Sequence, residues 1–277
     1  MNDKVMVAIP HYNASTQLDR LLSEITTGNF DRIVVLDDHS SDQAVLEVVK
    51  QKYPSVEFII GKKNLGSGGN RNRILDLDFD GIVWFLDCDM ELVTKNNATT
   101  LRKIFSKDKN QMIGGQLLAR DHSPMIWNYA HEMHPVNDEV FNLLCEPSFK
   151  AFAHIVAWHK LKERGWDYPW LRRKKVAKPR QVDWVAEGSF ALPMKLFKKV
   201  DGYDRTFRYH EGQDLARRIR SEGAKIIIHP DIVTRHLEVD VTKNRRNEDR
   251  DMAKFLFFQK HWDMNRKTYN KLFDKEE

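Results

Sequence analysis

Residues 82–92, IVWFLDCDMEL, are an apolar run that ends in acidic side chains at every second position. The apolar run predicts a buried strand. Asp87 and Asp89 lie on the same side of an extended chain, and Cys88 lies on the other. Their like charges repel each other unless a cation lies between them, and carboxylate oxygens bind Mg²⁺ and Mn²⁺, commonly together with phosphate oxygens. The stretch therefore predicts a divalent cation that also holds a phosphate; acids that cap a helix or face solvent are the alternative.

The elements that position these acids follow from an alternation of strand and helix patterns over the first 115 residues. Short runs rich in Val and Ile predict strands at 4–9, 32–37, 56–60 and 82–86. Amphipathic patterns predict helices between them. Such alternation is typical of an α/β fold with a mainly parallel, Rossmann-like sheet and helices on both faces. Ligands of such sheets bind beyond the carboxyl ends of the strands, where the polar clusters at 10–13, 37–42 and 87–91 fall.

The second part of the chain is less regular, and the last strand that we expect there is 224–230. We expect one domain over 1–277, with a nucleotide-binding half at 1–115 and an acceptor-binding half at 116–277. The second half contains a basic aromatic insertion at 150–181 and a C-terminal helix at 250–273, which packs on the core or lies on a membrane surface.

Composition and charge limit the classes of function that this chain could have. The chain has 277 residues and a net charge of +5. Its two cysteines are too few for a disulfide framework and do not have the spacing of a zinc site. No run approaches the roughly 18 apolar residues of a membrane span, and the first residues predict a strand rather than a secretory signal. Basic residues and tryptophans gather at 159–180, which predicts an anionic partner such as a lipid head group or nucleic acid, or a solvated loop.

Six segments in order resemble the successive blocks of family 2 glycosyltransferases, enzymes of the GT-A fold. The resemblance covers about residues 4–92 and 182–236 and rests on VAIPHYN, VVLDDHSSD, NLGSGGNRNRIL, VWFLDCDMEL, WVAEGSFALPMKLFKKVDGYD and HEGQDLARRIRSEGAKIIIHP. It implies a nucleoside-diphosphate sugar as donor.

The resemblance also implies a donor site. Pro10, Tyr12 and Asp37 or Asp38 would hold the base and ribose, since a tyrosine ring can stack on a base and a carboxylate can accept from its N–H. The glycine-containing loop and the helix start after it would bind the diphosphate through Asn64, Gly66, Arg71 and Asn72. Trp184 would form the floor under a sugar ring, or belong to the core.

For the metal, the resemblance makes Asp89 the direct ligand of Mn²⁺ or Mg²⁺. Asp87 would bind the ribose or the metal. His236, just past the last predicted strand, would bind the metal or the diphosphate.

The acid/base position departs from the family pattern. The family commonly has Glu-Asp here, followed two residues later by Asp-Leu, and the aspartate of the first pair acts as the base. This chain has Glu211 and then Gly212, and glycine cannot accept a proton. We expect Glu211 to act as the base, with Asp214 and Glu187 as alternatives. Asp214 could instead stabilise the start of its helix.

The predicted function is therefore inverting, metal-dependent transfer of a sugar to a hydroxyl of a glycan or lipid-linked acceptor. The expected location is cytoplasmic, with peripheral contact at the inner membrane face and no transmembrane segment. Two alternatives remain: a glycosyltransferase that modifies nucleic acid through 159–180, and a catalytically silent module that only binds a nucleotide sugar.

Overall fold

The computed structural model describes residues 3–125, 128–130, 132, 175–237 and 247–272. Within these residues nine strands form one sheet in the order β3-β2-β1-β4-β10-β6-β11-β5, and β8 also pairs with β11. The elements of the first half are β1 (Val5–His11), α1 (Ser15–Ile25), β2 (Arg32–Asp37), α2 (Gln43–Lys52), β3 (Glu57–Ile60), α3 (Gly66–Arg71), the 3-10 helix η1 (Asn72–Asp76), β4 (Ile82–Leu86), β5 (Met90–Leu92) and α4 (Asn97–Phe105). Those that follow are β6 (Gln111–Leu118), β7 (Tyr129–Ala130), β8 (Arg180–Val182), β9 (Trp184–Val185), β10 (Ser189–Pro193), α7 (Met194–Lys199), α8 (Glu211–Ser221), β11 (Lys225–His236), α9 (Asn247–Trp262) and α10 (Arg266–Leu272).

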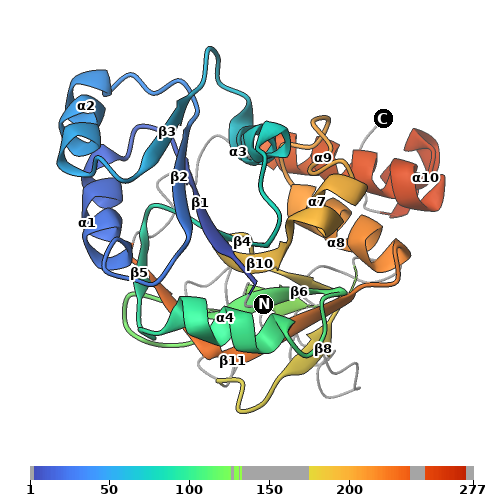
Figure 1. The fold of residues 1–277 in the computed structure, drawn as a ribbon. Helices are drawn as coiled ribbons and strands as arrows, with labels where there is room; N and C mark the ends of the chain where they lie inside the picture. The colour runs from blue at the N-terminus through green and yellow to red at the C-terminus, as the bar shows by residue number, and fades with distance from the viewer. Residues whose placement is uncertain (1–2, 126–127, 131, 133–174, 238–246, 273–277) are drawn as a thin grey trace.

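The four strands predicted at the start of the chain are present and parallel. β1 lies between β2 and β4, and β3 pairs with the far side of β2. Figure 1 shows α1 and α2 together beside these strands, and α7 to α10 gathered on the other side of the molecule. The carboxyl ends of β1, β2 and β4 therefore open on the same edge of the sheet.

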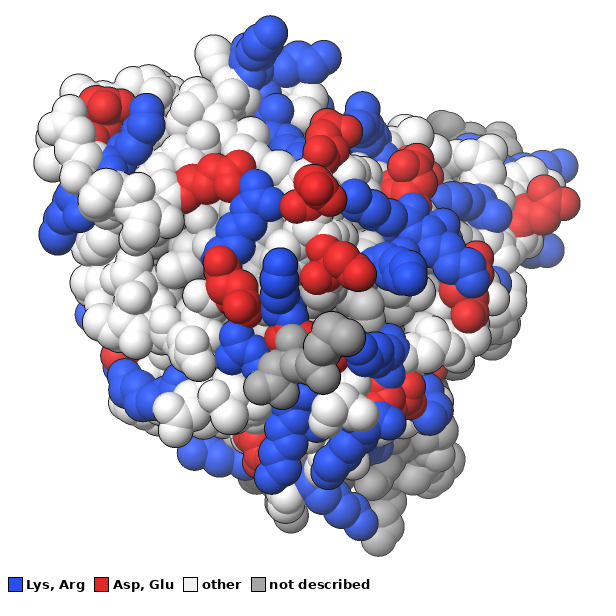
Figure 2. All heavy atoms as spheres, viewed as in Figure 1, with Lys and Arg blue, Asp and Glu red and all other residues white. Residues whose placement is uncertain are grey.

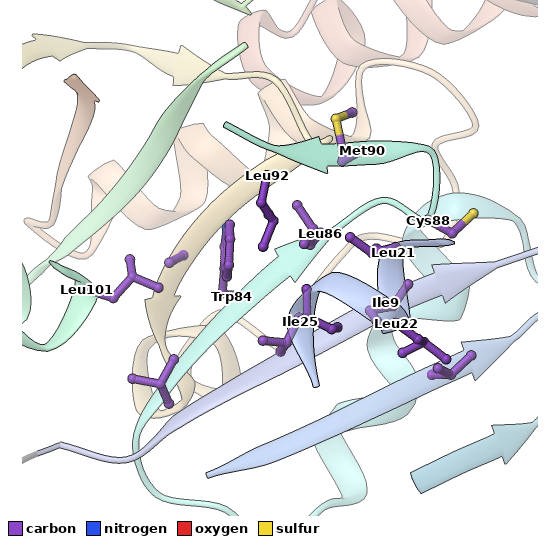
Figure 3. Close-up of a cluster of buried hydrophobic side chains, with 14 of the residues drawn as sticks. Ile9, Leu21, Leu22, Ile25, Trp84, Leu86, Cys88, Met90, Leu92 and Leu101 are labelled. Atoms are coloured by element: carbon purple, nitrogen blue, oxygen red, sulfur yellow. The ribbon is translucent and has the colours of Figure 1, made fainter. Parts of the chain in front are cut away.

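The core on one face of this sheet is formed by α1 against β1 and β4 (Figure 3). The apolar side chains of α1 recur at helical spacing and are completely buried: Leu18, Leu21, Leu22 and Ile25. They contact the cluster that contains Ile9, Trp84 and Leu86. Because all five residues of β4 are buried, the acids after it are carried by a rigid central strand.

The second half of the sheet is mixed rather than parallel. β10 runs antiparallel between β4 and β6, while β11 is parallel to β6 and antiparallel to β5. The α/β fold prediction is confirmed, and the antiparallel β10 is a difference from a purely parallel pattern. Strands from both predicted halves share one sheet, and we therefore propose that residues 1–277 form a single domain.

Two elements differ from the sequence expectation. The helix expected around Ile74 is the 3-10 helix η1. The strand expected to end at Pro230 continues as β11 to His236, with a register shift between His229 and Val233. A bulge of this kind accommodates a proline that cannot donate to the ladder, and it brings His236 into the sheet.

The C-terminal helix is also interrupted. Instead of one helix over 250–273, α9 ends at Trp262 and α10 begins at Arg266. Asp263 between them has φ of 50°, a left-handed conformation that stops a helix. α9 and α10 pack on the core through an aromatic cluster that includes Phe258 and Tyr269, both completely buried.

Surface charge is mixed on the face drawn in Figure 2, where Lys and Arg side chains are interspersed with Asp and Glu. Most of the basic stretch 159–180 lies outside the described residues, which include only its last six positions. Across the helices that the structure describes, none has the length and apolarity needed to cross a membrane.

Candidate active site

Several of the residues predicted for the site lie at or just after the carboxyl ends of β1, β2 and β4. Tyr12 follows β1 and is 53% exposed, so its ring is available for stacking. Pro10 is the last but one residue of β1 and pairs with Leu36 of β2. Their contacts with a nucleotide stay predictions.

Asp37, at the end of β2, is completely buried and is engaged by the chain itself. One carboxylate oxygen is 2.8 Å from Nδ1 of His11, and it also accepts from the Ser40 hydroxyl. Burial alone would raise the pKa of Asp37, but these hydrogen bonds lower it. In this arrangement Asp37 fixes the ends of β1 and β2, and a direct contact with the base or ribose stays a prediction.

Asp38 holds the glycine-containing loop in place. Its carboxylate accepts from the backbone N–H groups of Leu65 and Gly66 at 2.8 and 2.9 Å, and from Arg73 at 3.2 Å. Gly66 has φ of 75°, a conformation that glycine adopts without strain, and Asn64 also accepts from its N–H. The buried carboxylate of Asp38 therefore holds this loop at the carboxyl edge of the sheet.

Asp89 and His236 meet across two paired strands. β5 pairs antiparallel with β11, and Met90 lies opposite His236 in this pair. As a result Nε2 of His236 lies 3.1 Å from Oδ2 of Asp89. Both side chains are about one quarter exposed, so a ligand can reach them. The structure therefore brings together two of the three side chains predicted to bind a metal.

The third, Asp87, is paired with a buried arginine. Arg71 is 2% exposed, and its Nη2 lies 2.5 Å from Oδ1 of Asp87. The sequence placed Arg71 near the start of a helix, whereas it is the last residue of the short α3. Its guanidinium also contacts the Ser67 hydroxyl and lies 4.0 Å from Oε1 of Glu187.

Charge accumulates around Asp87. Burial raises the pKa of Asp87; Arg71 opposes this shift, and the neighbouring Asp89 adds to it. An excess of carboxylates beside a histidine fits a divalent cation, because Mg²⁺ and Mn²⁺ are commonly bound by one or two carboxylates with substrate phosphates completing the ligands. Among the described residues, no three His, Cys, Asp or Glu side chains are arranged to hold a metal by themselves. The residues therefore fit a cation that is shared with a diphosphate.

Three further groups surround Arg71 on the side of α8. Burial raises the pKa of Glu187 to about 8, and the charge of Glu211 contributes to this rise. Burial also raises the pKa of Glu211, which is 7% exposed in the first turn of α8. The phenol of Tyr203 is buried next to them, and its pKa is raised as well.

Asp214 has a different environment. It is completely buried, and its two oxygens are engaged by Arg218 at 2.7 Å, Lys260 at 2.6 Å and His261 at 2.8 Å. Burial alone would raise the pKa of Asp214, but these three partners lower it. These contacts support a structural role for Asp214, because they tie α8 to α9. Its role as a base stays a prediction.

The remaining two predicted residues have structural contacts. The amide of Asn72 donates to the backbone carbonyl of Tyr203 at 2.8 Å and accepts from its N–H at 2.7 Å. Trp184 in β9 is partly buried and packs against the buried cluster that contains Phe85 and Phe190. Their contacts with a donor stay predictions.

The sequence did not single out Ser67 and Tyr203, which both face Arg71. Ser67 lies one turn before Arg71 on α3, a spacing that could have indicated the contact. Tyr203 is in the GYD segment, but nothing in its spacing distinguishes it from a core aromatic.

Comparisons with known proteins identify the family of the chain. A family model described as glycosyl transferase family 2 matches residues 6–179, which is more than half of the chain. The amylovoran biosynthesis glycosyltransferase AmsB of Erwinia amylovora is 40% identical over 93 residues, which are 31% of this chain and 30% of that protein. The GalNAc(5)-diNAcBac-PP-undecaprenol beta-1,3-glucosyltransferase of Campylobacter jejuni is 29% identical over 105 residues, 36% of this chain and 34% of that protein. The matches thus span about a third of these relatives.

Solved structures share the fold. The mannosyltransferase PcManGT from Pyrobaculum calidifontis, in complex with GDP-Man and Mn²⁺, superposes with a TM-score of 0.60 at 14% identity, covering 99% of this chain and 69% of that one. GalNAc-T7 with UDP, GalNAc and Mn²⁺ superposes with a TM-score of 0.61 at 17% identity, covering 85% of this chain and 44% of that one. Together with the family match, the chain belongs to glycosyltransferase family 2 and has the GT-A fold.

Proposed function

We propose that the protein transfers a sugar from a nucleoside-diphosphate donor to a hydroxyl, with inversion at the anomeric carbon. The observation that carries this proposal is the buried Arg71, paired with Asp87 at the end of β4 and placed between the Asp89–His236 pair and the carboxylates near α8. A diphosphate and a reacting hydroxyl need cations and a carboxylate side by side. This arrangement supplies both.

The steps assigned to the chain follow from its charges. A carboxylate near α8 takes the proton of the acceptor hydroxyl, whose oxygen then bonds to the anomeric carbon from the face opposite the diphosphate. The bond between that carbon and the diphosphate oxygen breaks, and the nucleoside diphosphate leaves with the electron pair. Arg71 stabilises the leaving group because its positive charge is held in a site that excludes water.

Asp89 and His236 would hold Mn²⁺ or Mg²⁺, with Asp87 beside them. When bound, the cation supplies additional positive charge for the departing diphosphate, so no second carboxyl is needed to protonate it. The two fold neighbours solved with Mn²⁺ support a divalent cation in this role.

For the acceptor we propose a glycan or a lipid-linked saccharide. The names of the relatives support this, since one acts in amylovoran biosynthesis and another on an undecaprenol-linked saccharide. A nucleic-acid acceptor lacks support among the described residues, because residues 159–174 lie outside them. A cytoplasmic location, with peripheral contact at the inner membrane face, remains part of the proposal.

Donor turnover tests the proposal against a silent binding module. Release of nucleoside diphosphate from UDP-glucose, UDP-GalNAc and GDP-mannose is measured with Mn²⁺ and with EDTA, alongside thermal stabilisation by UDP and GDP. Metal-dependent release that is lost with EDTA and falls about 100-fold in Asp89→Ala supports a transferase. Stabilisation by a nucleoside diphosphate without release of any donor supports the silent module instead.

A further inference from the structure

Gly212, the residue at the family's base position, lies against the carboxylate of Glu187. A Cβ atom added to Gly212 would lie 2.8 Å from Cδ and 2.9 Å from Oε2 of Glu187. Carbon and oxygen atoms do not approach a Cβ this closely, so any other residue at 212 would displace the carboxylate. The volume next to α8 that a side chain at 212 would enter is therefore filled by the carboxylate of Glu187.

The two residues reach this place from different segments. Gly212 is the second residue of α8, and Glu187 lies in the short connection between β9 and β10. The connection is anchored where it approaches β4, because the N–H of Asp87 donates to the carbonyl of Gly188 at 3.0 Å. The carboxylate of Glu187 is thus fixed relative to the acids at the end of β4.

Within the described part of the chain, the carboxylate of Glu187 has no cation at hydrogen-bond distance. Its Oε1 is buried, its nearest cation is Arg71 at 4.0 Å, and the phenol of Tyr203 lies beside its carboxylate. The whole side chain is 25% exposed.

The other two carboxylates are less suited to this role. Asp214 is completely buried, and Arg218, Lys260 and His261 engage its two oxygens. Glu211 is only 7% exposed, whereas the side chain of Glu187 is 25% exposed and its carboxylate lies between Gly212 and Arg71 at contact distance of the first and 4.0 Å from the second.

We propose that Glu187 is the catalytic base of this protein and that Gly212 admits its carboxylate. The inference rests on the proposed function and specifies its base: Glu187 accepts the proton of the acceptor O–H as that oxygen bonds to the anomeric carbon, and the diphosphate leaves with the electrons of the broken C–O bond. The family's carboxylate is retained at the same place but comes from the β9–β10 connection.

A reciprocal exchange tests this assignment. Glu187→Gln should lower metal-dependent release of nucleoside diphosphate by about 100-fold or more, the typical contribution of a positioned base. Glu187→Ala should lose as much, and Gly212→Asp added to it should restore at least about a tenth of the wild-type rate, because a carboxylate returns to a vacated volume. Glu187→Ala combined with Gly212→Ala is the matched control: it fills the same space without a carboxylate and should stay inactive.

Thermal stabilisation by UDP or GDP with Mn²⁺ reports on folding and donor binding in each variant, and it should remain near that of the wild type. If Glu187→Gln keeps the wild-type rate while Glu211→Gln loses it, Glu211 is the base and the assignment to Glu187 is overturned while the transferase function stands. If the wild type releases no nucleoside diphosphate, the proposed function and this assignment both fall.

Discussion

Arg71 organises the site at the scale of single residues. A guanidinium that is 2% exposed needs counter-charges, and Asp87 supplies the nearest one. Burial alone would lower the pKa of Arg71, but Asp87, Glu187 and Glu211 keep it above its ordinary value. The carboxylates gain less from this pairing, because burial and their mutual repulsion raise their own pKa values. Such an imbalance is expected where a protein sacrifices stability to prepare a site.

The raised pKa of Glu187 predicts that this residue lowers the stability of the folded protein at high pH. Its pKa rises from an ordinary 4.5 to about 8, so the folded protein holds a proton that the unfolded chain releases, and stability falls as the pH rises between these values. We expect Glu187→Gln to stabilise the metal-free protein by roughly 1–3 kcal/mol at about pH 8.5 and much less at about pH 5. Thermal unfolding in EDTA at both pH values measures this.

The matched control is Glu222→Gln, since Glu222 pairs with Lys199 on the surface and should change little at either pH. A gain for Glu187→Gln that is equal at both pH values would contradict the explanation.

Asp89 allows a second test at this scale. We expect Asp89→Asn to raise the Mn²⁺ concentration needed for stabilisation by UDP or GDP about 10-fold or more, because even outer partners of a metal ligand contribute that much. Glu91→Gln is the control, since Glu91 lies two residues further along the chain and pairs with Arg235. Equal Mn²⁺ dependence in the two variants would place the cation elsewhere.

At the scale of elements, the sequence predicts what short-range periodicity encodes. The strands of the first half and α1 follow from alternating Val, Ile and Leu, and the acids at the strand ends follow from parallel pairing. The position of β10 between β4 and β6 could not be predicted, because it depends on pairing between residues far apart in the chain. The contact of Glu187 with Gly212 depends on the same long-range placement, so the sequence alone left three carboxylates as candidate bases.

The packing of α9 on α8, like the position of β10, could not be predicted from the periodicity of the sequence. Asp214 of α8 binds Lys260 and His261 of α9, as well as Arg218 of its own helix, and the carboxylate is completely buried. We expect Asp214→Asn to lower the free energy of unfolding by about 3–5 kcal/mol, since it leaves the cations without their carboxylate. Urea unfolding monitored by circular dichroism measures this.

Asp204→Asn removes a partly exposed carboxylate from the same Lys260 and should cost about 1 kcal/mol or less. If both variants lower the free energy of unfolding by the same small amount, the contacts of Asp214 contribute little to holding α9.

At the scale of the whole molecule, the site requires both halves of the chain. Arg71, Asp87 and Asp89 come from the first half, whereas Glu187, Glu211 and His236 come from the second. One sheet connects them through β4 and β10, which pair over their full length from Leu86 to Ile82. We therefore propose that this continuous sheet, within a single domain, sets the distances within the site.

This connection predicts a single unfolding transition. Phe190 of β10 is completely buried, and its ring stacks on Phe85 of β4 with 4.9 Å between the centroids. We expect Phe190→Ala to lower the free energy of unfolding by about 3–5 kcal/mol and to shift circular dichroism and tryptophan fluorescence together in urea, because both halves lose the same core. Val48→Ala, at a position that is 64% exposed on α2, should leave the midpoint almost unchanged. Two separated transitions in Phe190→Ala, with one of them at the wild-type midpoint, would show that the halves fold independently and would contradict the single domain.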